Sequence, residues 1–507
     1  MQTDPLFHKR GLSWFVIVAA VFLLRSFAWF NAELWYDEVL TLTRFVFNNQ
    51  DGSLANVFRD YPIANNHILS TAVYWIWTHL VGLPDEAILR IPSILAGLAA
   101  IAIVMRHWRK FIGDCLATVG GFMLAISPVF TAYAYQVRGY ALTFLLAAVA
   151  VSGVFEILYD NRRKGQLLFA TASLLLPLVM PTNAMLAPAL LAVVIFCHWK
   201  NKRDWKTIII DCIPAVIATA LGAGYYLTIW EQFKHVIAEP DGWSSATMVA
   251  ANLLLAAIAH AAILPLFILP KRKQTDNPPE ATEQEDVPNQ KQLLWFAISM
   301  ISVSALLTIL SLVVSRSGHA PFPRVYLVFL MPVTAAILAL AKARSIHQSF
   351  TFATLAVIVL CNGILWERFA TGITDYQLAH NHVPDNLLQQ YYRGSTELRE
   401  MARANIENKQ SMFIVTDAYD IMSFRFYWSL QELPSQSVAG INELPEDFWK
   451  KLPFQDLQLR AFAKSPEQAA DFFQKAGLGD AKELLPKLEI VNAMPNNSLR
   501  KLYKLRN

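Results

Sequence analysis

Long apolar runs separated by short basic loops constrain this chain more than any other feature of its sequence. A helix needs roughly 17 to 25 apolar residues to cross a bilayer, and about eleven runs fall in or near that range. Hydrophobic residues make up 55% of the 507 residues and charged residues only 16%, against about 25% charged in soluble domains. We therefore expect a polytopic α-helical membrane protein. The runs are Leu12–Phe30, Ala87–Met105, Phe111–Val129, Tyr140–Leu158, Leu167–Met180, Ala184–Phe196, Thr207–Thr228, Ala246–Leu269, Leu293–Val314, Val325–Ala341 and Phe350–Trp366.

The first run is too long for a cleaved signal peptide and lacks a small-residue cleavage site, so we interpret it as an anchor. The net charge of +4 is spread over the loops, and nothing indicates a nucleic-acid partner. The cysteines lie in or beside apolar runs without metal-ligand spacing, which favours small buried side chains. They are Cys115, Cys197, Cys212 and Cys361.

Basic residues concentrate in alternate loops, and this alternation predicts the topology. Lysine and arginine cluster before the first run and in loops near residues 106–110, 162–164, 200–206, 271–273 and 342–344. The positive-inside rule places these segments in the cytoplasm. Everything after Trp366 then lies outside, together with segments 31–86, 130–139, 181–183, 229–245 and 315–324.

One apolar stretch, Ile68–Leu83, breaks this parity, because a further span there would force the basic loop at 106–110 outward. Its Tyr74, Trp75 and Trp77 suit a helix lying at headgroup depth. We expect an interfacial helix in the first outer loop, with a true span as the alternative.

Two regions do not have membrane character. Residues 271–292 are proline-rich and acidic, which predicts a disordered cytoplasmic linker. Residues 369–507 have soluble composition, with expected strands at 412–416 and 457–463 and a helix that Ser465 begins and Gly477 stops. The predicted division is a transmembrane domain over 1–368 and a small periplasmic α/β domain over 369–507.

An acidic pair, Asp37 and Glu38, follows the first run at the outer membrane surface. A carboxylate there could act as general base for a hydroxyl held within hydrogen-bond reach. The plainer alternative is a solvated pair that marks a helix end. The same loop carries Asn66 and His67, where asparagine is a natural helix N-cap and the histidine could bind a hydroxyl or phosphate or fill a structural role.

Two arginines, Arg138 and Arg324, open the fourth and tenth runs at the outer face beside aromatic residues. The planar guanidinium suits phosphate oxygens, while snorkelling to lipid headgroups is the alternative. A base-like carboxylate with outer-face arginines fits transfer of a group from a lipid-linked phosphate. A transporter or flippase is the competing class, but it would place ionisable residues near the midplane in paired repeats. A non-catalytic scaffold would leave the acidic pair unexplained.

The motifs WYDE, NNHIL, GLPDEAILRIPSILAGLAAIAIV, YQVRGYALTFLL and PFPRVYLVFLMP, in this order, resemble the GT-C superfamily of polyprenyl-phosphate-sugar-dependent glycosyltransferases. The resemblance covers roughly residues 12–345. Within this superfamily the chain resembles bacterial lipopolysaccharide galacturonic acid transferases and, more distantly, aminoarabinose transferases and protein O-mannosyltransferases.

The resemblance implies an inverting transfer at the periplasmic face of the inner membrane, in which Asp37 is the base and Glu38 its acidic neighbour. It implies that Arg138 and Arg324 bind the donor phosphate. Further donor or acceptor contacts are expected from His67, Asn66, Tyr135, Tyr140 and His319. We expect no obligatory cofactor, although the acidic pair could hold a divalent cation.

Two departures from the relatives stand out. Gln136 replaces an acid that often precedes the arginine, so a role for that missing carboxylate is in doubt. His67 is followed by Ile68 where relatives often have proline.

Overall fold

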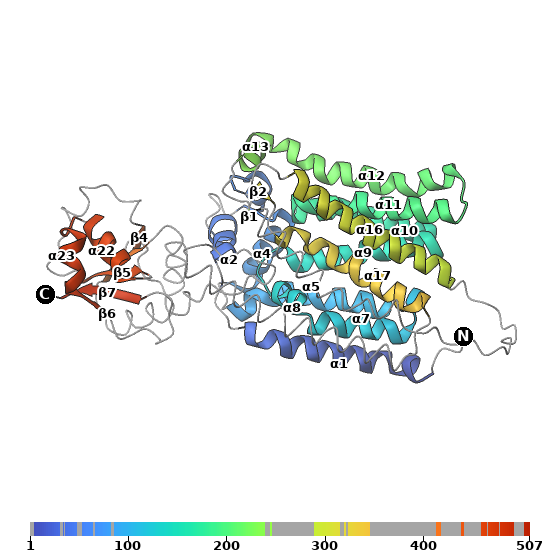
Figure 1. Ribbon diagram of the computed structural model, residues 1–507, viewed down its shortest axis with the longest axis horizontal. Helices are drawn as coiled ribbons and strands as arrows, with labels where there is room; N and C mark the ends of the chain where they lie inside the picture. The colour runs from blue at the N-terminus through green and yellow to red at the C-terminus, as the bar shows by residue number, and fades with distance from the viewer. Residues whose placement is uncertain are drawn as a thin grey trace. The chain divides into compact units, whose positions relative to one another are not determined.

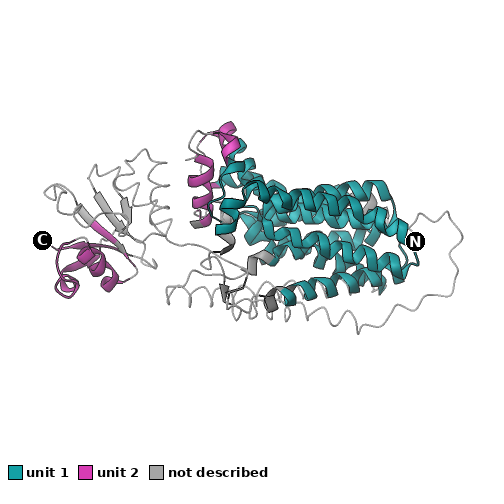
Figure 2. Ribbon diagram, turned by 90° about the horizontal axis from the view of Figure 1, so that it is seen from above, with its two compact units in different colours: residues 1–30, 57–77, 87–390 teal, residues 31–56, 78–86, 391–507 magenta. Residues whose placement is uncertain are grey.

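The computed structural model describes residues 5–30, 34, 36–47, 53–63, 66–82, 86–238, 244–245, 288–314, 319–320, 323–344, 412–416, 438–440, 458–463, 465–475, 477–490 and 501–506. The chain divides into two compact units, which we describe separately (Figure 2). The first comprises residues 1–30, 57–77 and 87–390, and the second comprises residues 31–56, 78–86 and 391–507.

The first unit is a bundle of long helices lying side by side (Figure 1). Nine of the predicted apolar runs each coincide with one of these helices, and the runs at 246–269 and 350–366 lie outside the described residues. The helices are α1 (Pro5–Phe30), α5 (Glu86–Arg106), α7 (Asp114–Ile126), α9 (Tyr140–Tyr159), α10 (Arg162–Val179), α11 (Leu186–Lys200), α12 (Trp205–Thr228), α16 (Gln290–Val314) and α17 (Leu330–Ala343).

Six of the described helical stretches are long and apolar enough to cross a membrane. The helical membrane class is therefore established, and the total of about eleven spans stays a prediction. Helix α16 begins at Gln290, so the expected linker is at least three residues shorter than 271–292; its residues before 288 lie outside the described part.

Short elements connect the bundle helices. They are α3 (Leu54–Arg59), α4 (Ile68–Val81), α6 (Arg109–Ile112), α8 (Pro128–Ala134), η2 (Pro181–Met185), α13 (Trp230–Ala238), the strands β1 (Ser244–Ser245) and β2 (His319–Ala320), and η4 (Pro323–Phe329). The stretch 68–81 is helical as expected, and its depth in a membrane stays a prediction.

Local sequence signals start several helices. Asn161 Oδ1 accepts from the Lys164 amide at 3.0 Å and caps α10. Asp204 caps α12, accepting from the Thr207 amide at 3.2 Å and from its hydroxyl at 2.6 Å. These hydrogen bonds to Thr207 hold the pKa of Asp204 below its ordinary value. Each cap satisfies amides that a helix start would otherwise leave without a partner.

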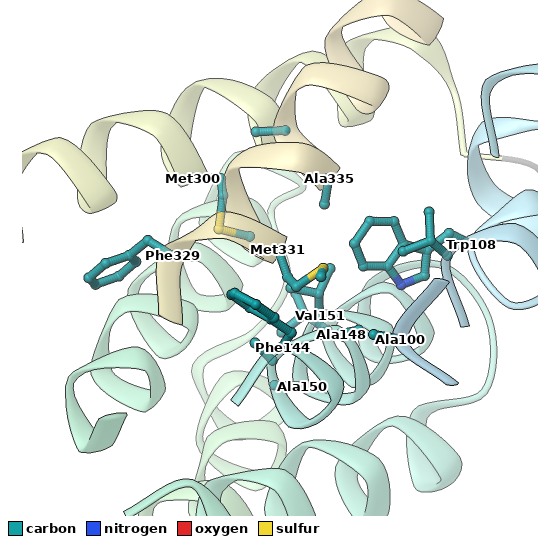
Figure 3. Packing of buried hydrophobic residues seen from close by; sticks show 14 of the residues in the cluster. Ala100, Trp108, Phe144, Ala148, Ala150, Val151, Met300, Phe329, Met331 and Ala335 are labelled. Carbon is teal, nitrogen blue, oxygen red and sulfur yellow. The ribbon is translucent and has the colours of Figure 1, made fainter. Parts of the chain in front are cut away.

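The interior of the bundle is close-packed. A buried cluster joins α5, α9, α16 and α17, and Figure 3 shows Phe144, Met300 and Met331 pointing into it. Trp108, fully buried, donates from Nε1 to Ser152 Oγ at 2.9 Å. Helices α9 and α10 approach through Gly153, where an added Cβ would lie 2.6 Å from the Phe169 amide nitrogen. Small residues allow such backbone contact between membrane helices.

The described loops among those predicted to be cytoplasmic gather at one end of the bundle, which we call the basic end. Lys110 pairs with Asp160 across two of these loops. The Tyr159 hydroxyl donates to the Gln292 carbonyl at 3.2 Å, which brings the beginning of α16 to the same end. The grouping that the charge pattern requires is therefore present in the bundle.

The second unit contains a five-stranded sheet in the order β4-β3-β5-β7-β6. Its strands are β3 (Met412–Thr416), β4 (Val438–Gly440), β5 (Gln458–Ala463), β6 (Leu488–Ile490) and β7 (Lys501–Leu505). Strand β3 pairs parallel with β4 and β5, and β7 pairs antiparallel with β5 and β6.

Helix α22 (Pro466–Lys475) packs on this sheet through Phe472 and Phe473. Ser465 Oγ accepts from the Gln468 amide at 3.2 Å, and Gly477 has φ +78°, so both predicted helix signals are present. Two short helices, α23 (Ala481–Leu484) and η6 (Leu485–Lys487), precede β6. The boundary at 368/369 lies outside the described residues and stays a prediction.

Candidate functional site

The acidic pair lies at the start of α2 (Tyr36–Thr41), which continues as the π-helical turn η1 (Leu42–Phe47) in the second unit. Asp37 is half-buried, and Glu38 is 1% exposed. The Thr41 hydroxyl donates to the Asp37 carbonyl at 2.8 Å within the same helix. The burial of Glu38 argues against a simple solvated pair, because a carboxylate removed from water costs free energy unless it is paired or hydrogen-bonded.

His67 and Arg138, 71 residues apart in sequence, meet in the interior of the first unit. Both are 3% exposed, and Arg138 Nη2 lies 3.1 Å from His67 Nε2. The Gly139 amide donates to His67 Nδ1 at 3.0 Å. The contact lies at the beginning of α9, at the end of the bundle opposite the basic end, and we call it the Arg138 end.

Tyr140 completes this group. Its ring meets the His67 imidazole edge-on at 5.6 Å between centroids, and the Arg138 guanidinium lies 5.8 Å from its centroid. Tyr133 packs against it at 4.8 Å. The Tyr140 hydroxyl is buried and has no hydrogen-bond partner among the described residues. An arginine over a tyrosine face gains a cation–π interaction, so the guanidinium is oriented by aromatic contact.

Asn66 does not cap α4, contrary to the prediction. Its Nδ2 donates to the Val57 carbonyl at 3.0 Å and the Asp60 carbonyl at 2.7 Å. Its Oδ1, the atom that a cap would use, has no partner in the described part of the chain. These two hydrogen bonds hold the backbone of the loop before α4, directly beside His67 in the sequence.

Arg90 was missed by sequence reasoning. It is fully buried in the second turn of α5, and its guanidinium lies 5.3 Å from the centroid of the Tyr135 ring. An arginine inside an apolar run is itself a functional signal, and the motif AILRIPS carried it. Tyr135, which we predicted to contact the donor or acceptor, therefore packs against Arg90, a second buried cation of the same unit.

Gln136, which stands where relatives often have an acid, holds the turn between α8 and α9. Its carbonyl accepts from Ser93 Oγ at 2.5 Å and from the Arg138 amide at 2.7 Å. Its Nε2 donates to the Ala132 carbonyl at 3.2 Å, and its Oε1 lacks a partner among the residues described. Gln136 Oε1 is therefore a buried acceptor that makes no hydrogen bond with the described residues.

Arg324 and His319 are placed by their backbones alone. Arg324 lies in η4, which packs against α9 and against η2. His319 pairs with Ser245 across β1 and β2. The structure therefore joins His67, Arg138 and Tyr140 directly, with Asn66 beside them. The described residues include no group of three or more His, Cys, Asp or Glu side chains that could hold a metal ion.

A second feature at the Arg138 end is an aromatic cluster of Tyr61, Tyr226 and Phe233, with Tyr61 and Tyr226 at 5.6 Å. Burial raises the pKa of the Tyr61 phenol. Gln232 ties the cluster to the first outer loop, accepting from the Tyr61 amide at 2.6 Å and donating to the Arg59 carbonyl at 2.9 Å.

No protein-family model and no curated protein sequence matches this chain. Among solved structures it is similar to ArnT from Cupriavidus metallidurans bound to undecaprenyl phosphate, at 15% identity and a TM-score of 0.49, over 97% of this chain and 98% of that one. It is also similar to the oligosaccharyltransferase AglB from Archaeoglobus fulgidus in complex with an inhibitory peptide and a dolichol-phosphate, at 13% identity and a TM-score of 0.42. That match covers 94% of this chain and 71% of the other.

Each of these two structures contains a polyprenyl phosphate. The TM-scores lie below 0.5, so the function proposed below rests on the residues of this chain rather than on these likenesses.

Proposed function

We propose that this chain is an inverting GT-C-type glycosyltransferase that moves a sugar from a polyprenyl-phosphate donor to an acceptor hydroxyl at the outer face of the bacterial inner membrane. The acceptor belongs to the cell envelope, with lipopolysaccharide as the first candidate. The observation that carries the proposal is Arg138, an arginine 3% exposed in an apolar bundle, at the end away from the basic loops. A buried cation at such a position needs an anionic or aromatic partner and marks a functional site.

The reaction is a single displacement. The Asp37 carboxylate takes the proton from the acceptor hydroxyl as that oxygen bonds to the anomeric carbon. The bond from this carbon to the phosphate oxygen breaks, and its electron pair leaves with the polyprenyl phosphate. Negative charge grows on the phosphate, so cations from Arg138 and Arg324 stabilise the transition state more than the ground state.

The remaining predicted residues have supporting roles. Glu38 shapes the electrostatics beside the base, and His67 and Tyr140 surround the arginine. Asn66, Tyr135 and His319 line the approach of donor or acceptor. Buried Arg90 joins this group as a second cation that the sequence reasoning did not use. The domain over 369–507 lies on the same outer side and helps to admit the acceptor.

The alternative is a transporter or lipid flippase. Intramembrane ionisable residues of transporters concentrate near the midplane. In the described bundle helices and the turns between them, the buried charged side chains lie toward the helix ends: Glu86, Arg90 and Arg138 at one, Glu156 and Asp211 at the other. This distribution favours chemistry at one face over passage through the centre.

The test is sugar transfer by purified protein in detergent, with undecaprenyl-phosphate-linked hexoses, pentoses and uronic acids as donors. Asp37→Asn should lower kcat by about 10² to 10⁴-fold, as for a positioned base, and should leave the melting temperature unchanged. Asp60→Asn, an exposed carboxylate of the same outer loop, is the matched control and should transfer normally.

Unchanged transfer by Asp37→Asn would remove the base assignment. If the wild type transfers no sugar but moves polyprenyl lipids across vesicle bilayers, the transporter class replaces the transferase. We expect transfer to persist in a chelator, and its loss would point to a cation at the acidic pair.

A further inference from the structure

A cleft of about 390 Å³ opens at the Arg138 end of the bundle, between the end of α3 and the turn from α12 to α13. Figure 1 shows α13 directly after this end of α12. Arg59 and residues 227–232 line the cleft, which lies beside the aromatic cluster of Tyr61, Tyr226 and Phe233. Its volume falls in the range of small-molecule sites, about 300 to 1,000 Å³. The cleft is therefore large enough to hold part of a ligand.

Three hydrogen bonds hold the walls of this cleft together. Gln232 Nε2 donates to the Arg59 carbonyl at 2.9 Å, and Gln232 Oε1 accepts from the Tyr61 amide at 2.6 Å. The Tyr225 hydroxyl donates to the Phe58 carbonyl. Because these bonds join segments 167 to 173 positions apart, the backbone that carries Arg59 is fixed relative to α13. A wall that is already in place reduces the ordering cost of binding.

The cleft contains a positive charge that its own acidic residue does not neutralise. The Arg59 side chain is exposed and makes no ion pair with any residue that the structure describes. Glu231, the acid that lines the cleft, is paired with Lys234 instead. The neighbouring Asp60 is not among the lining residues. A guanidinium in this setting suits an anionic ligand, since its planar fork matches the oxygens of a phosphate or carboxylate.

Trp230 adds an exposed aromatic surface to the same cleft. Its side chain is 47% exposed, and its ring is supported by Phe233 at 6.3 Å between centroids. An indole offers a flat apolar face and one N–H donor, and a sugar ring offers an apolar C–H face edged by hydroxyls. The plainer role for a tryptophan at a helix end is anchoring at the membrane surface. Its place in one cleft with a cation favours a ligand that is both saccharide and anion.

We infer that this cleft binds the anionic sugar headgroup of the lipid acceptor, with Arg59 on a phosphate or carboxylate and Trp230 against a sugar ring. The inference rests on the proposed function and deepens it, because it assigns an acceptor subsite and the chemistry that the subsite recognises. The two side chains bind and take no part in the displacement. An acceptor held here lies at the same end of the bundle as Arg138, where the donor phosphate is proposed to bind.

The test measures binding of three lipids to the purified full chain in detergent by native mass spectrometry. Lipid A supplies a phosphorylated disaccharide, dephosphorylated lipid A supplies the same sugars without that charge, and phosphatidylglycerol supplies a phosphate without a sugar. The wild type should prefer lipid A to the other two. Arg59→Gln should weaken lipid A binding about 10-fold, the loss of one charge-assisted hydrogen bond, and leave binding of the dephosphorylated form unchanged. Trp230→Ala should weaken binding of both sugar lipids about 3- to 10-fold.

Matched controls come from the basic end. Arg163 and Trp205 are exposed residues of the same two kinds, and Arg163→Gln and Trp205→Ala should bind all three lipids as the wild type does. Unchanged lipid A binding by Arg59→Gln would overturn the inference. Unchanged binding by Trp230→Ala would overturn it too and make that ring a membrane anchor. A wild type that binds phosphatidylglycerol as tightly as lipid A would show a site for phosphate alone, which also contradicts the inference.

Should the variants not fold, hydrogen–deuterium exchange of the wild type gives the answer. Peptides that cover residues 54–61 and 227–234 should gain protection with lipid A and not with phosphatidylglycerol. Bound lipid A without protection of these peptides would contradict the inference. None of these measurements requires sugar transfer. A wild type that transfers no sugar to any acceptor would therefore overturn the proposed function separately, so the two failures are distinguishable.

Discussion

The two ends of the helix bundle treat buried charge differently. At the basic end, Glu156 is fully buried and forms a salt bridge with Lys164, with 2.6 Å between Lys164 Nζ and Glu156 Oε1. Asp211, 1% exposed, pairs with Arg162 and lies 3.1 Å from His198 Nε2. At the other end, the contacts of Arg138 include the His67 imidazole and the Tyr140 ring.

The difference separates stability from function. Opposite charges that meet inside a low-dielectric interior neutralise one another, and removing one partner leaves a buried charge behind. At the other end, an imidazole and an aromatic face help to set the direction of the Arg138 guanidinium. The basic end therefore holds helices together through ion pairs, and the Arg138 end is where we propose that a cation meets the donor phosphate.

The largest expected effect comes from exchanging arginine for methionine at each end. Arg138→Met should lower sugar transfer at least about 10²-fold, the loss typical of one charge-stabilising donor, with the melting temperature little changed. Arg162→Met is the matched control at the basic end and should lower the melting temperature while the KM for the donor stays constant. Equal loss of sugar transfer in both variants would contradict the claim that only the Arg138 end has a role in transfer.

Next in size is Asp211→Asn. The carboxylate accepts from Arg162 and from Gln166 Nε2 at 2.9 Å, and hydrogen bonds to charged groups contribute about 1.5 to 3 kcal/mol. Thermal unfolding in detergent should occur several degrees lower. At about 20 °C, below the unfolding transition, the donor KM and kcat of the variant should match those of the wild type. A changed donor KM with an unchanged melting temperature would contradict a purely structural role.

Gly139→Ala should act at the Arg138 end with a smaller effect on stability. The added Cβ overpacks against His67 and Val179, and such overpacking costs about 1 to 3 kcal/mol when the neighbours shift. Displacement of the ring should raise the donor KM. Gly224→Ala is the control, because nothing lies within 4 Å of its added Cβ; it should keep the wild-type KM. A normal KM for Gly139→Ala would show that the ring position is unimportant.

The smallest effect compares two helix caps. Ser127 Oγ accepts from the Phe130 amide at 3.3 Å at the start of α8, and Asn161 caps α10 at the basic end. Replacing either with alanine should cost about 0.5 to 2 kcal/mol. Both variants should retain the wild-type donor KM, since capping is local. A raised KM for Ser127→Ala alone would extend the functional region to α8.

Much of the bundle could be predicted from the sequence because a bilayer dictates the length and polarity of each segment. The run at 140–158 became α9 almost residue for residue, and the basic loops gathered as their charges required. The C-terminal helix was predictable because Ser465 and Gly477 act on their immediate neighbours.

The site was less predictable, because its contacts join distant segments. Nothing local indicates that the Gly139 amide meets His67 72 residues earlier in the chain. Asn66 was read as a cap, and its amide instead binds carbonyls of the preceding loop. Arg90 lies within the predicted apolar run 87–105 and was not considered as a site residue, although its charge alone could have singled it out. Asp37 as base stays a prediction.

The most direct test of the central claim is an electron cryo-microscopy structure of the wild-type protein in lipid nanodiscs with bound undecaprenyl phosphate. The account predicts a phosphate at the end of the bundle opposite the basic loops, about 3 Å, hydrogen-bond distance, from the Arg138 guanidinium. A phosphate bound beside Arg162 and the other basic-end residues, with Arg138 untouched, would contradict it.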